Sequence, residues 1–231
     1  MRTIGLVGGM SWESSAHYYR LINEGVRDRL GPPSSARCLL LSVDFGEVAR
    51  LQHAGDWDAL AATMVEAARA LERGGAEMVM LCTNTMHRVA DAVAAGLGVP
   101  LLHIADPVGE AIRAAGVARV GLLGTRFTME GAFLRDRLAA RYGIEVLVPD
   151  EADRATVHRV IYDELVAGRI EPASREAYRA VMARLVARGA EAVVLGCTEI
   201  MMLVGEGDCA VPLFDTTALH AAAAVEWALA G

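Results

Sequence analysis

The stretch Gly75-Ala76-Glu77-Met78-Val79-Met80-Leu81-Cys82-Thr83-Asn84 occurs a second time, in altered form, as Gly189-Ala190-Glu191-Ala192-Val193-Val194-Leu195-Gly196-Cys197-Thr198. Each copy leads from a Gly-Ala-Glu turn through a short apolar run to small polar residues. When the copies are aligned on Gly-Ala-Glu, Cys197 falls opposite Thr83 and not opposite Cys82. The repeat therefore predicts which two side chains occupy equivalent positions.

Two further pairs of segments extend the repeat over most of the chain. Ile4-Gly5-Leu6-Val7-Gly8-Gly9 is similar to Val120-Gly121-Leu122-Leu123-Gly124-Thr125, and Pro100-Leu101-Leu102-His103 is similar to Pro212-Leu213-Phe214-Asp215. The period is far too long for a solenoid. Buried strands of α/β proteins also resemble one another in hydrophobicity alone. The shared Gly-Ala-Glu turn and the polar residues after it favour two similar halves.

Short apolar runs alternate with amphipathic segments, a pattern typical of parallel sheets covered by helices on both faces. Strands are predicted at residues 3–7, 38–43, 78–81, 101–103, 119–123, 145–147, 192–195 and 212–214. Helices are predicted at residues 14–30, 57–73, 85–96, 106–115, 127–142, 150–167, 174–188 and 217–229.

The composition argues against several classes of protein. A net charge of −7 and an aromatic content of 5% argue against a nucleic-acid partner. The chain contains no lysine, which excludes a pyridoxal-phosphate Schiff base and a P-loop. Its four cysteines form no C-x-x-C and no histidine pair has ligand spacing, so no metal site is predicted. Without a signal peptide or membrane-spanning run, we expect a cytoplasmic protein with free thiols.

Small or reactive residues follow four of the predicted strands, where parallel sheets bind their ligands. These segments are 8–11, 83–85, 124–125 and 197–199. Gly8 and Gly9 would let the amides of Met10 and Ser11 approach a carboxylate. Amides at the start of the helix after Cys197 would lower the pKa of that thiol and make it a candidate thiolate.

If the halves face each other, these four segments converge on one cleft. Two groups on opposite sides of a bound carboxylate can remove the α-proton from one face of a carbon and supply one to the other. Amides that stabilise the carboxylate as it takes up charge would make this possible without a cofactor.

Three motifs of the chain resemble those of a known family. The Gly-Gly-Met start, Asn84-Thr85-x-His87 and Gly196-Cys197-Thr198-Glu199 resemble the cofactor-independent aspartate/glutamate racemase superfamily, from end to end of the chain. The segments 8–14 and 82–87 look most like the subgroup of L-aspartate/glutamate-specific or broad-specificity amino-acid racemases.

The resemblance implies an α/β fold of two pseudo-symmetric Rossmann-like lobes. Each lobe would be a short parallel sheet with flanking helices, and the active site would lie in the cleft between them. We expect residues 1–105 and 216–231 to form lobe 1 and residues 106–215 to form lobe 2. The resemblance also implies a homodimer that acts on a small amino acid.

One motif departs from the family pattern. The family usually has Cys-Asn-Thr, with that cysteine as one of two catalytic thiols, whereas Thr83 precedes Asn84 here and Cys82 stands one place earlier. Adjacent strand residues point to opposite faces, so Cys82 should face away if Thr83 faces the cleft. Threonine is a poor base unless another group takes its proton. Glu199, His87 and water are candidates, although His87 could equally cap or pack on its helix.

We therefore predict a cofactor-independent amino-acid racemase that works by two-base proton abstraction and return at Cα. Thr83 and Cys197 are the predicted catalytic pair. The predicted substrate-binding residues are Met10, Ser11, Gln52, Asn84, Thr85, Thr125, Thr198 and Glu199. The resemblance favours Gln52 over Arg50 as the partner of a second carboxylate.

Other readings stay open from the sequence. The chain lacks a lysine that some aspartate racemases carry near residues 162–167, so a neutral or broad substrate range is possible. The alternatives in function are hydantoin racemisation, maleate isomerisation or malonate decarboxylation by the same superfamily, and a two-lobed binding protein without turnover.

Overall fold

The structure is a computed structural model that describes residues 1–230. It divides into two compact units. The first comprises Met1–Ile104 together with the residues that follow Thr216, and the second comprises Ala105–Thr216. The backbone therefore crosses from one unit to the other after Ile104 and again after Thr216.

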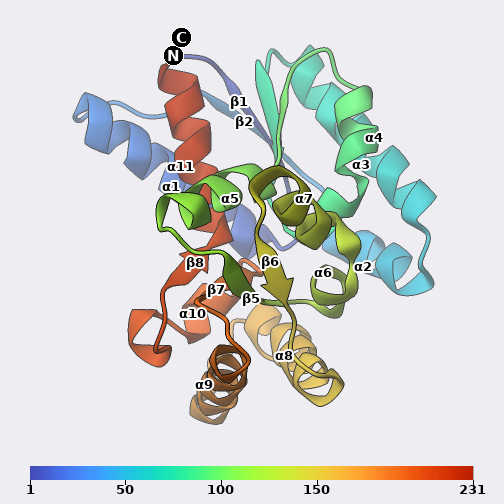
Figure 1. Ribbon diagram of the computed structural model, residues 1–231. Helices are drawn as coiled ribbons and strands as arrows, with labels where there is room; N and C mark the ends of the chain where they lie inside the picture. Colours follow the sequence, from blue (N-terminus) through green and yellow to red (C-terminus); the bar gives the residue numbers. More distant parts are fainter. Residues whose placement is uncertain (231) are drawn as a thin grey trace. The chain divides into compact units, whose positions relative to one another are not determined.

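The first unit contains a four-stranded parallel sheet in the order β2-β1-β3-β4 (Figure 1). Its strands are β1 (Ile4–Gly8), β2 (Cys38–Ser42), β3 (Met78–Leu81) and β4 (Leu101–Leu102). Its helices are α1 (Trp12–Leu30), α2 (Phe45–Ala54), α3 (Trp57–Arg73), the 3-10 turn η1 (Thr85–Val89), α4 (Ala90–Ala95) and α11 (Thr216–Leu229).

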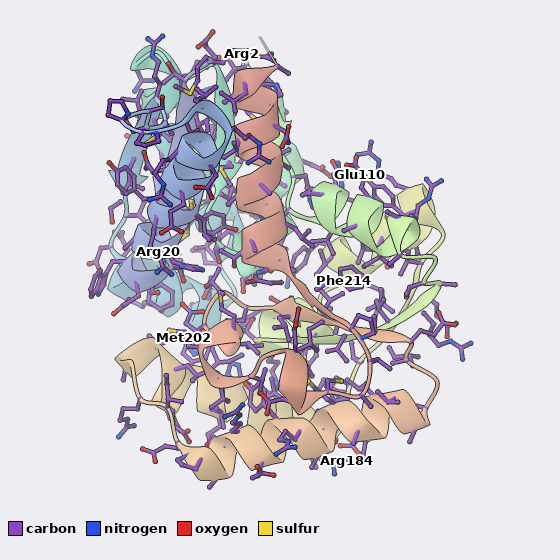
Figure 2. The ribbon with its side chains drawn as sticks, turned by 90° about the vertical axis from the view of Figure 1, so that its left-hand side faces the viewer. Arg2, Arg20, Glu110, Arg184, Met202 and Phe214 are labelled. Carbon is purple, nitrogen blue, oxygen red and sulfur yellow. The ribbon has the colours of Figure 1, made fainter. Side chains whose placement is uncertain are left out.

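Two apolar clusters pack on opposite faces of this sheet, because alternate strand residues point to opposite sides. Met78 and Met80 pack with residues of α1 and α11, which lie side by side in Figure 1. Val79 and Leu81 pack instead with residues of α2 and α3. Near the end of α11, the Arg2 guanidinium stacks 4.1 Å from the centre of the Trp227 ring; Figure 2 labels Arg2 at this end of the helix.

The second unit repeats the strand order as β6-β5-β7-β8, again all parallel. Its strands are β5 (Arg119–Gly124), β6 (Glu145–Leu147), β7 (Ala192–Gly196) and β8 (Leu213–Asp215). Its helices are α5 (Ala105–Ala114), α6 (Arg126–Glu130), α7 (Ala132–Tyr142), α8 (Glu151–Asp163), η2 (Leu165–Ala167), α9 (Pro172–Ala187), α10 (Ile200–Leu203) and η3 (Glu206–Asp208). Figure 2 labels Arg184 on α9 and Met202 in α10.

Helices α8 and α9 supply much of the apolar core of the second unit. Val157 and Val160 of α8 pack with Tyr178 and Val181 of α9 and with Val193 of β7. The Tyr178 hydroxyl donates a hydrogen bond of 2.9 Å to the carbonyl of Val157, which satisfies a polar group that is otherwise fully buried.

The predicted α/β fold with two helix-flanked parallel sheets is confirmed, and the strands agree with the predicted ones within two residues. Three predicted helices are wrong in detail, and one helix was not predicted. The predicted helix 85–96 begins as the 3-10 turn η1 and is α-helical only from Ala90 to Ala95. The predicted helix 127–142 is two helices, because the chain becomes extended at Gly131, where a Cβ would lie 2.5 Å from the Phe127 carbonyl. The predicted helix 150–167 ends at Asp163. Helix α2 was not predicted, although Asp44 caps its start and Gly55 adopts the left-handed conformation after its end.

Candidate active site

Thr83 follows the end of β3 and is held through both of its main-chain polar groups. Its N–H donates to the carbonyl of Leu81 at 2.9 Å, and its carbonyl accepts a hydrogen bond of 2.8 Å from His87 Nδ1. The residue is buried, with 8% of its surface exposed. Because the main chain is fixed on both sides of the Cα atom, the direction of its Cα–Cβ bond is fixed as well.

Cys82 has a different environment from Thr83. It is fully buried and belongs to the apolar cluster of Met78 and Met80 with α1 and α11. Burial raises the pKa of the Cys82 thiol, with a smaller contribution from Cys38. A thiol in such surroundings behaves as a small apolar side chain.

Asn84 and Thr85 begin the turn η1, and both are buried. Gln52 of α2 reaches the same turn, because its Nε2 atom donates to Met86 Sδ at 3.3 Å. Gln52 is buried, whereas Arg50 is exposed. Gln52 and Arg50 were the two candidates to bind a second carboxylate of the substrate. The structure brings Gln52 to the segment after β3 and leaves Arg50 in solvent.

Met10 and Ser11 follow β1, the strand next to β3 in the sheet, and both are buried. Ser11 caps α1 by accepting a hydrogen bond from the N–H of Ser14 at 3.3 Å. The preceding Gly9 has a φ of +89°, and a Cβ there would lie 2.2 Å from the Val43 carbonyl. The glycine is thus required by the close approach of the loop after β2. This packing is a reason for the glycine that the sequence did not reveal.

In the second unit, Cys197 follows β7 and donates a hydrogen bond from its thiol to Glu199 Oε2 at 3.0 Å. The Thr198 hydroxyl donates to the same oxygen at 2.8 Å. Thr198 and Glu199 are buried, and Cys197 is partly buried. The three consecutive residues therefore form one connected group, in which the carboxylate is the acceptor for both neighbours.

The expected low pKa of Cys197 is a prediction that the structure overturns. Burial raises the pKa of the Cys197 thiol well above its usual value, and the charge and hydrogen bond of Glu199 act in the same direction. Main-chain amides at Glu199 and Thr198 act in the opposite direction but do not outweigh these effects. A carboxylate that accepts the thiol proton favours the neutral thiol, so Cys197 rests as a thiol and not as a thiolate.

Two further residues of the second unit lie near this group. Thr125 follows β5, the strand beside β7, and caps α6 by accepting from the N–H of Thr128 at 3.3 Å. Tyr162 packs on the same apolar cluster as Cys197. Burial, with the charges of Cys197 and Glu199, raises the pKa of Tyr162 to about 12, so its phenol stays protonated at neutral pH.

The predicted site residues thus form two groups, one in each unit. The carboxyl ends of β1 and β3 bring together the group of the first unit: Met10, Ser11, Gln52, Thr83, Asn84 and Thr85. The carboxyl ends of β5 and β7 bring together the group of the second unit: Thr125, Cys197, Thr198 and Glu199. Sequence reasoning missed Tyr162, and it also missed His103 and His220, which pack around His87. His103 ends the repeated segment Pro100–His103 and His220 lies in no motif, so the sequence held no signal that either packs on His87.

The strand registers give the two groups a common frame. Val7 pairs with Leu81 in the first sheet, and Leu123 pairs with Leu195 in the second. Thr83 stands two residues after Leu81, and Cys197 stands two residues after Leu195. The two residues therefore occupy the same place relative to sheets of the same strand order.

The described residues, 1–230, contain neither a cluster of metal-ligating side chains nor a membrane-spanning helix. Over this range, no three His, Cys, Asp or Glu side chains are arranged to hold a metal ion. Within the same residues, none of the helices is long and apolar enough to cross a bilayer.

The chain is similar to known racemases in sequence and in fold. The chain is 25% identical to the broad specificity amino-acid racemase RacX of Bacillus subtilis over 178 residues, covering 76% of this chain and 75% of that protein. A Yersinia pestis protein provisionally named an Asp/Glu racemase has a crystal structure similar to this one, with a TM-score of 0.93 and 51% identity over 99% of this chain and all of that chain.

The structure of an aspartate racemase homologue from Pyrococcus horikoshii is also similar. Its TM-score is 0.86 with 33% identity, over 99% of this chain and all of that one. The sequence profile of the Asp/Glu/Hydantoin racemases matches residues 7–224, nearly the whole length. The chain therefore belongs to the Asp/Glu/Hydantoin racemase family.

Proposed function

We propose that this racemase inverts the α-carbon of an amino acid without a cofactor, with Thr83 and Cys197 exchanging protons with opposite faces of that carbon. The proposal rests mainly on the equivalence of their positions. Thr83 stands two residues after Leu81 and Cys197 two residues after Leu195, and these leucines have equivalent places in sheets of the same strand order. A reaction that inverts one carbon needs two such groups, one for each face.

The chemistry begins at the Cys197 thiol, which is hydrogen-bonded to Glu199. The thiol proton passes to the Glu199 carboxylate, and the resulting thiolate takes the proton from Cα. The electron pair left on Cα is delocalised into the substrate carboxylate. The Thr83 hydroxyl then gives its proton to the opposite face of Cα. The proton held by Glu199 returns through solvent to the Thr83 oxygen, so Cys197, Glu199 and Thr83 all recover their starting states. In the reverse direction each proton retraces this path.

The remaining residues hold the substrate in this proposal. Negative charge develops on the α-carboxylate during proton transfer, and N–H and hydroxyl groups stabilise it. These groups come from Met10, Ser11, Asn84, Thr85, Thr125 and Thr198. Glu199 binds the amino group through its carboxylate, which is ionised when the substrate arrives. Gln52 faces the substrate side chain, and as a neutral amide it suits a polar side chain as well as a second carboxylate.

The substrate range is best settled by a direct screen. Enantiopure amino acids with acidic, polar and apolar side chains are incubated with the purified protein after dialysis against chelator and hydroxylamine, and optical rotation is followed. The proposal predicts loss of rotation for at least one acidic or polar amino acid without added pyridoxal phosphate. Activity on hydantoins, malonates or maleate with none on amino acids would overturn it, as would restoration of activity only by pyridoxal phosphate or a divalent metal.

We also propose that the protein is a cytoplasmic homodimer. The four cysteines are free, in keeping with a reducing compartment. Trp12, Tyr19 and Leu40 are exposed by 68%, 50% and 45%. They border a surface hollow of about 390 Å³ whose other lining residues are Ser15, Ala16 and Ser42. This surface carries no charge, so a two-fold contact would bring it against its own copy without repulsion, despite the net charge of −7.

A further inference from the structure

The imidazole of His87 lies between two main-chain groups of opposite character. Its Nδ1 atom is 2.8 Å from the carbonyl oxygen of Thr83, which can only accept a hydrogen bond. Its Nε2 atom is 3.1 Å from the N–H of Ile104, which can only donate. These partners require a proton on Nδ1 and a bare Nε2, so they define one neutral tautomer.

Both ring nitrogens are therefore occupied by the main chain, and neither is free to take the proton of the Thr83 hydroxyl. A second proton on Nε2 would point at the Ile104 N–H and break that hydrogen bond. Burial and the neighbouring rings of His103 and His220 lower the pKa of His87 well below its usual value, which agrees with the geometry.

We propose that His87 is a positioning residue that aims the Thr83 hydroxyl, and that it does not act as the base for Thr83. This inference rests on the proposed function of Thr83. The N–H of Thr83 is bound to Leu81 and its carbonyl to His87, so loss of the imidazole would release one of the two bonds that set the Cα–Cβ direction. A displacement of about 1 Å in a reacting group can cost on the order of 10²-fold in rate.

The imidazole is itself braced by other buried rings. His103 lies 4.6 Å and His220 lies 5.7 Å from the centre of the His87 ring. His220 is held by the Tyr18 hydroxyl at 3.1 Å and by the carbonyl of Leu102 at 2.9 Å. Ile104 is the last residue before the chain leaves the first unit, and His220 follows its return. His87 thus connects Thr83 to the part of the first unit where the chain leaves it after Ile104 and returns to it after Thr216.

The two hydrogen bonds can be separated by substitution. In His87→Asn the amide nitrogen takes the place of Nδ1 and can still donate to the Thr83 carbonyl, but the side chain no longer reaches Ile104. In His87→Gln the longer side chain can present an oxygen to the Ile104 N–H while losing the bond to Thr83. His87→Ala loses both. Tyr18→Phe loosens the same cluster without touching His87 and serves as the control for stability.

The measurement is incorporation of solvent deuterium at Cα, started from each enantiomer separately. We expect His87→Ala to lose on the order of 10²-fold in the exchange that depends on Thr83. The enantiomer deprotonated by Cys197 should still exchange without inversion. His87→Asn should recover most of the loss, and His87→Gln should recover little. Tyr18→Phe should lower the melting temperature while leaving the balance between the two enantiomers unchanged.

Several results would overturn the positioning role. If His87 were the base, His87→Asn would be as defective as His87→Ala, and a limb of the pH profile of kcat/KM would disappear in both. If its role were only structural, the exchange of both enantiomers would fall together, or Tyr18→Phe would reproduce the asymmetry. ¹⁵N spectra of labelled histidine supply a readout independent of activity: we expect a protonated Nδ1 and a bare Nε2 through neutral pH, and the opposite tautomer would refute the assignment.

Failure of the proposed function would look different. If Thr83→Ala and Cys197→Ser both racemised at the wild-type rate, the two-base assignment itself would be wrong. If those variants were inactive in inversion but His87→Ala kept full exchange from both enantiomers, only the positioning role would be refuted.

Discussion

The Cys197 thiol donates its hydrogen bond to Glu199, so the resting protein holds a neutral sulfur beside a carboxylate. A neutral thiol removes no α-proton, and the carboxylate is the group in contact with it that can accept the thiol proton. The same carboxylate raises the pKa of the thiol through its charge and hydrogen bond, after the larger effect of burial. Glu199 therefore has two opposite effects on Cys197, and a single substitution separates them.

Glu199→Gln should slow racemisation at neutral pH by about 10²-fold, because the amide cannot take the thiol proton. It should at the same time speed alkylation of Cys197 by iodoacetamide, since loss of the negative charge lowers the pKa of the thiol and increases the thiolate fraction. Activity of the variant should recover partly as the pH rises, when hydroxide replaces the carboxylate as the proton acceptor. Equal declines in alkylation and racemisation would contradict this role of Glu199.

Cys82 and Thr83 test the register of the strand end. Cys82→Ala removes a sulfur from an apolar cluster and should cost about 1 kcal/mol of stability with little change in kcat. Thr83→Cys should provide a second thiol and bring the kcat values for the two enantiomers closer together. Since the equilibrium constant of a racemisation is one, kcat/KM stays equal for both. An inactive Cys82→Ala together with an active Thr83→Ala would place Cys82, and not Thr83, at the reacting carbon.

At the scale of the elements, Asp208 links η3 to α9. Its side chain is buried and accepts two hydrogen bonds of 2.9 Å from Arg175, and one of 2.8 Å from the N–H of Gly205. These bonds favour the ionised carboxylate and lower the pKa of Asp208 below its usual value.

Asp208→Asn should lower the melting temperature at pH 7, by about 2–4 °C for each kcal/mol lost in a chain of this size. A group with a lowered pKa stabilises the fold fully above its unfolded pKa of about 3.9, and this contribution is lost as the pH falls further. The difference between wild type and variant should therefore be constant from pH 7 to about pH 5 and shrink below about pH 4. The exposed Asp136→Asn is the control. A difference that grew on acidification would contradict the cited direction of the shift.

A helix or strand could be predicted from the sequence where neighbouring residues alone determine it. The central strands could be predicted because four or five consecutive buried residues form an apolar run in the sequence, as in Met78–Leu81. Helix α2 was missed because its apolar stripe is short, although Asp44 and Gly55 mark both ends. The break at Gly131 depends on contacts with Phe127 and Phe133, which a single helical pattern does not reveal.

The site shows the same division between local and distant causes. The equivalence of Thr83 and Cys197 could be predicted because it is written in the repeat. The direction of the Cys197 pKa shift could not be predicted, because it depends on burial and on the position of the Glu199 carboxylate. The state of His87 depends on Ile104, His103 and His220, which lie far from it in sequence.

At the scale of the whole molecule, the proposed dimer can be tested through its uncharged surface. Trp12→Asp would place two like charges together across a two-fold contact, and should convert the dimer to a monomer in light scattering after size exclusion. Ile170→Asp changes another exposed apolar residue, in the second unit, and should leave the dimer intact. A wild-type monomer, or equal effects of the two substitutions, would contradict the assignment of this surface.

In the proposed mechanism, Thr83 and Cys197 act on opposite faces of Cα. The most direct test follows inversion and deuterium incorporation in D₂O from each pure enantiomer, for wild type, Thr83→Ala and Cys197→Ser. Wild type should invert both enantiomers with solvent deuterium in the product. Each variant should lose inversion by about 10²- to 10⁴-fold. Exchange without inversion should persist in Thr83→Ala for one enantiomer, and any that remains in Cys197→Ser should affect only the other. Exchange of the same enantiomer in both variants, or near-normal inversion in either, would contradict the account.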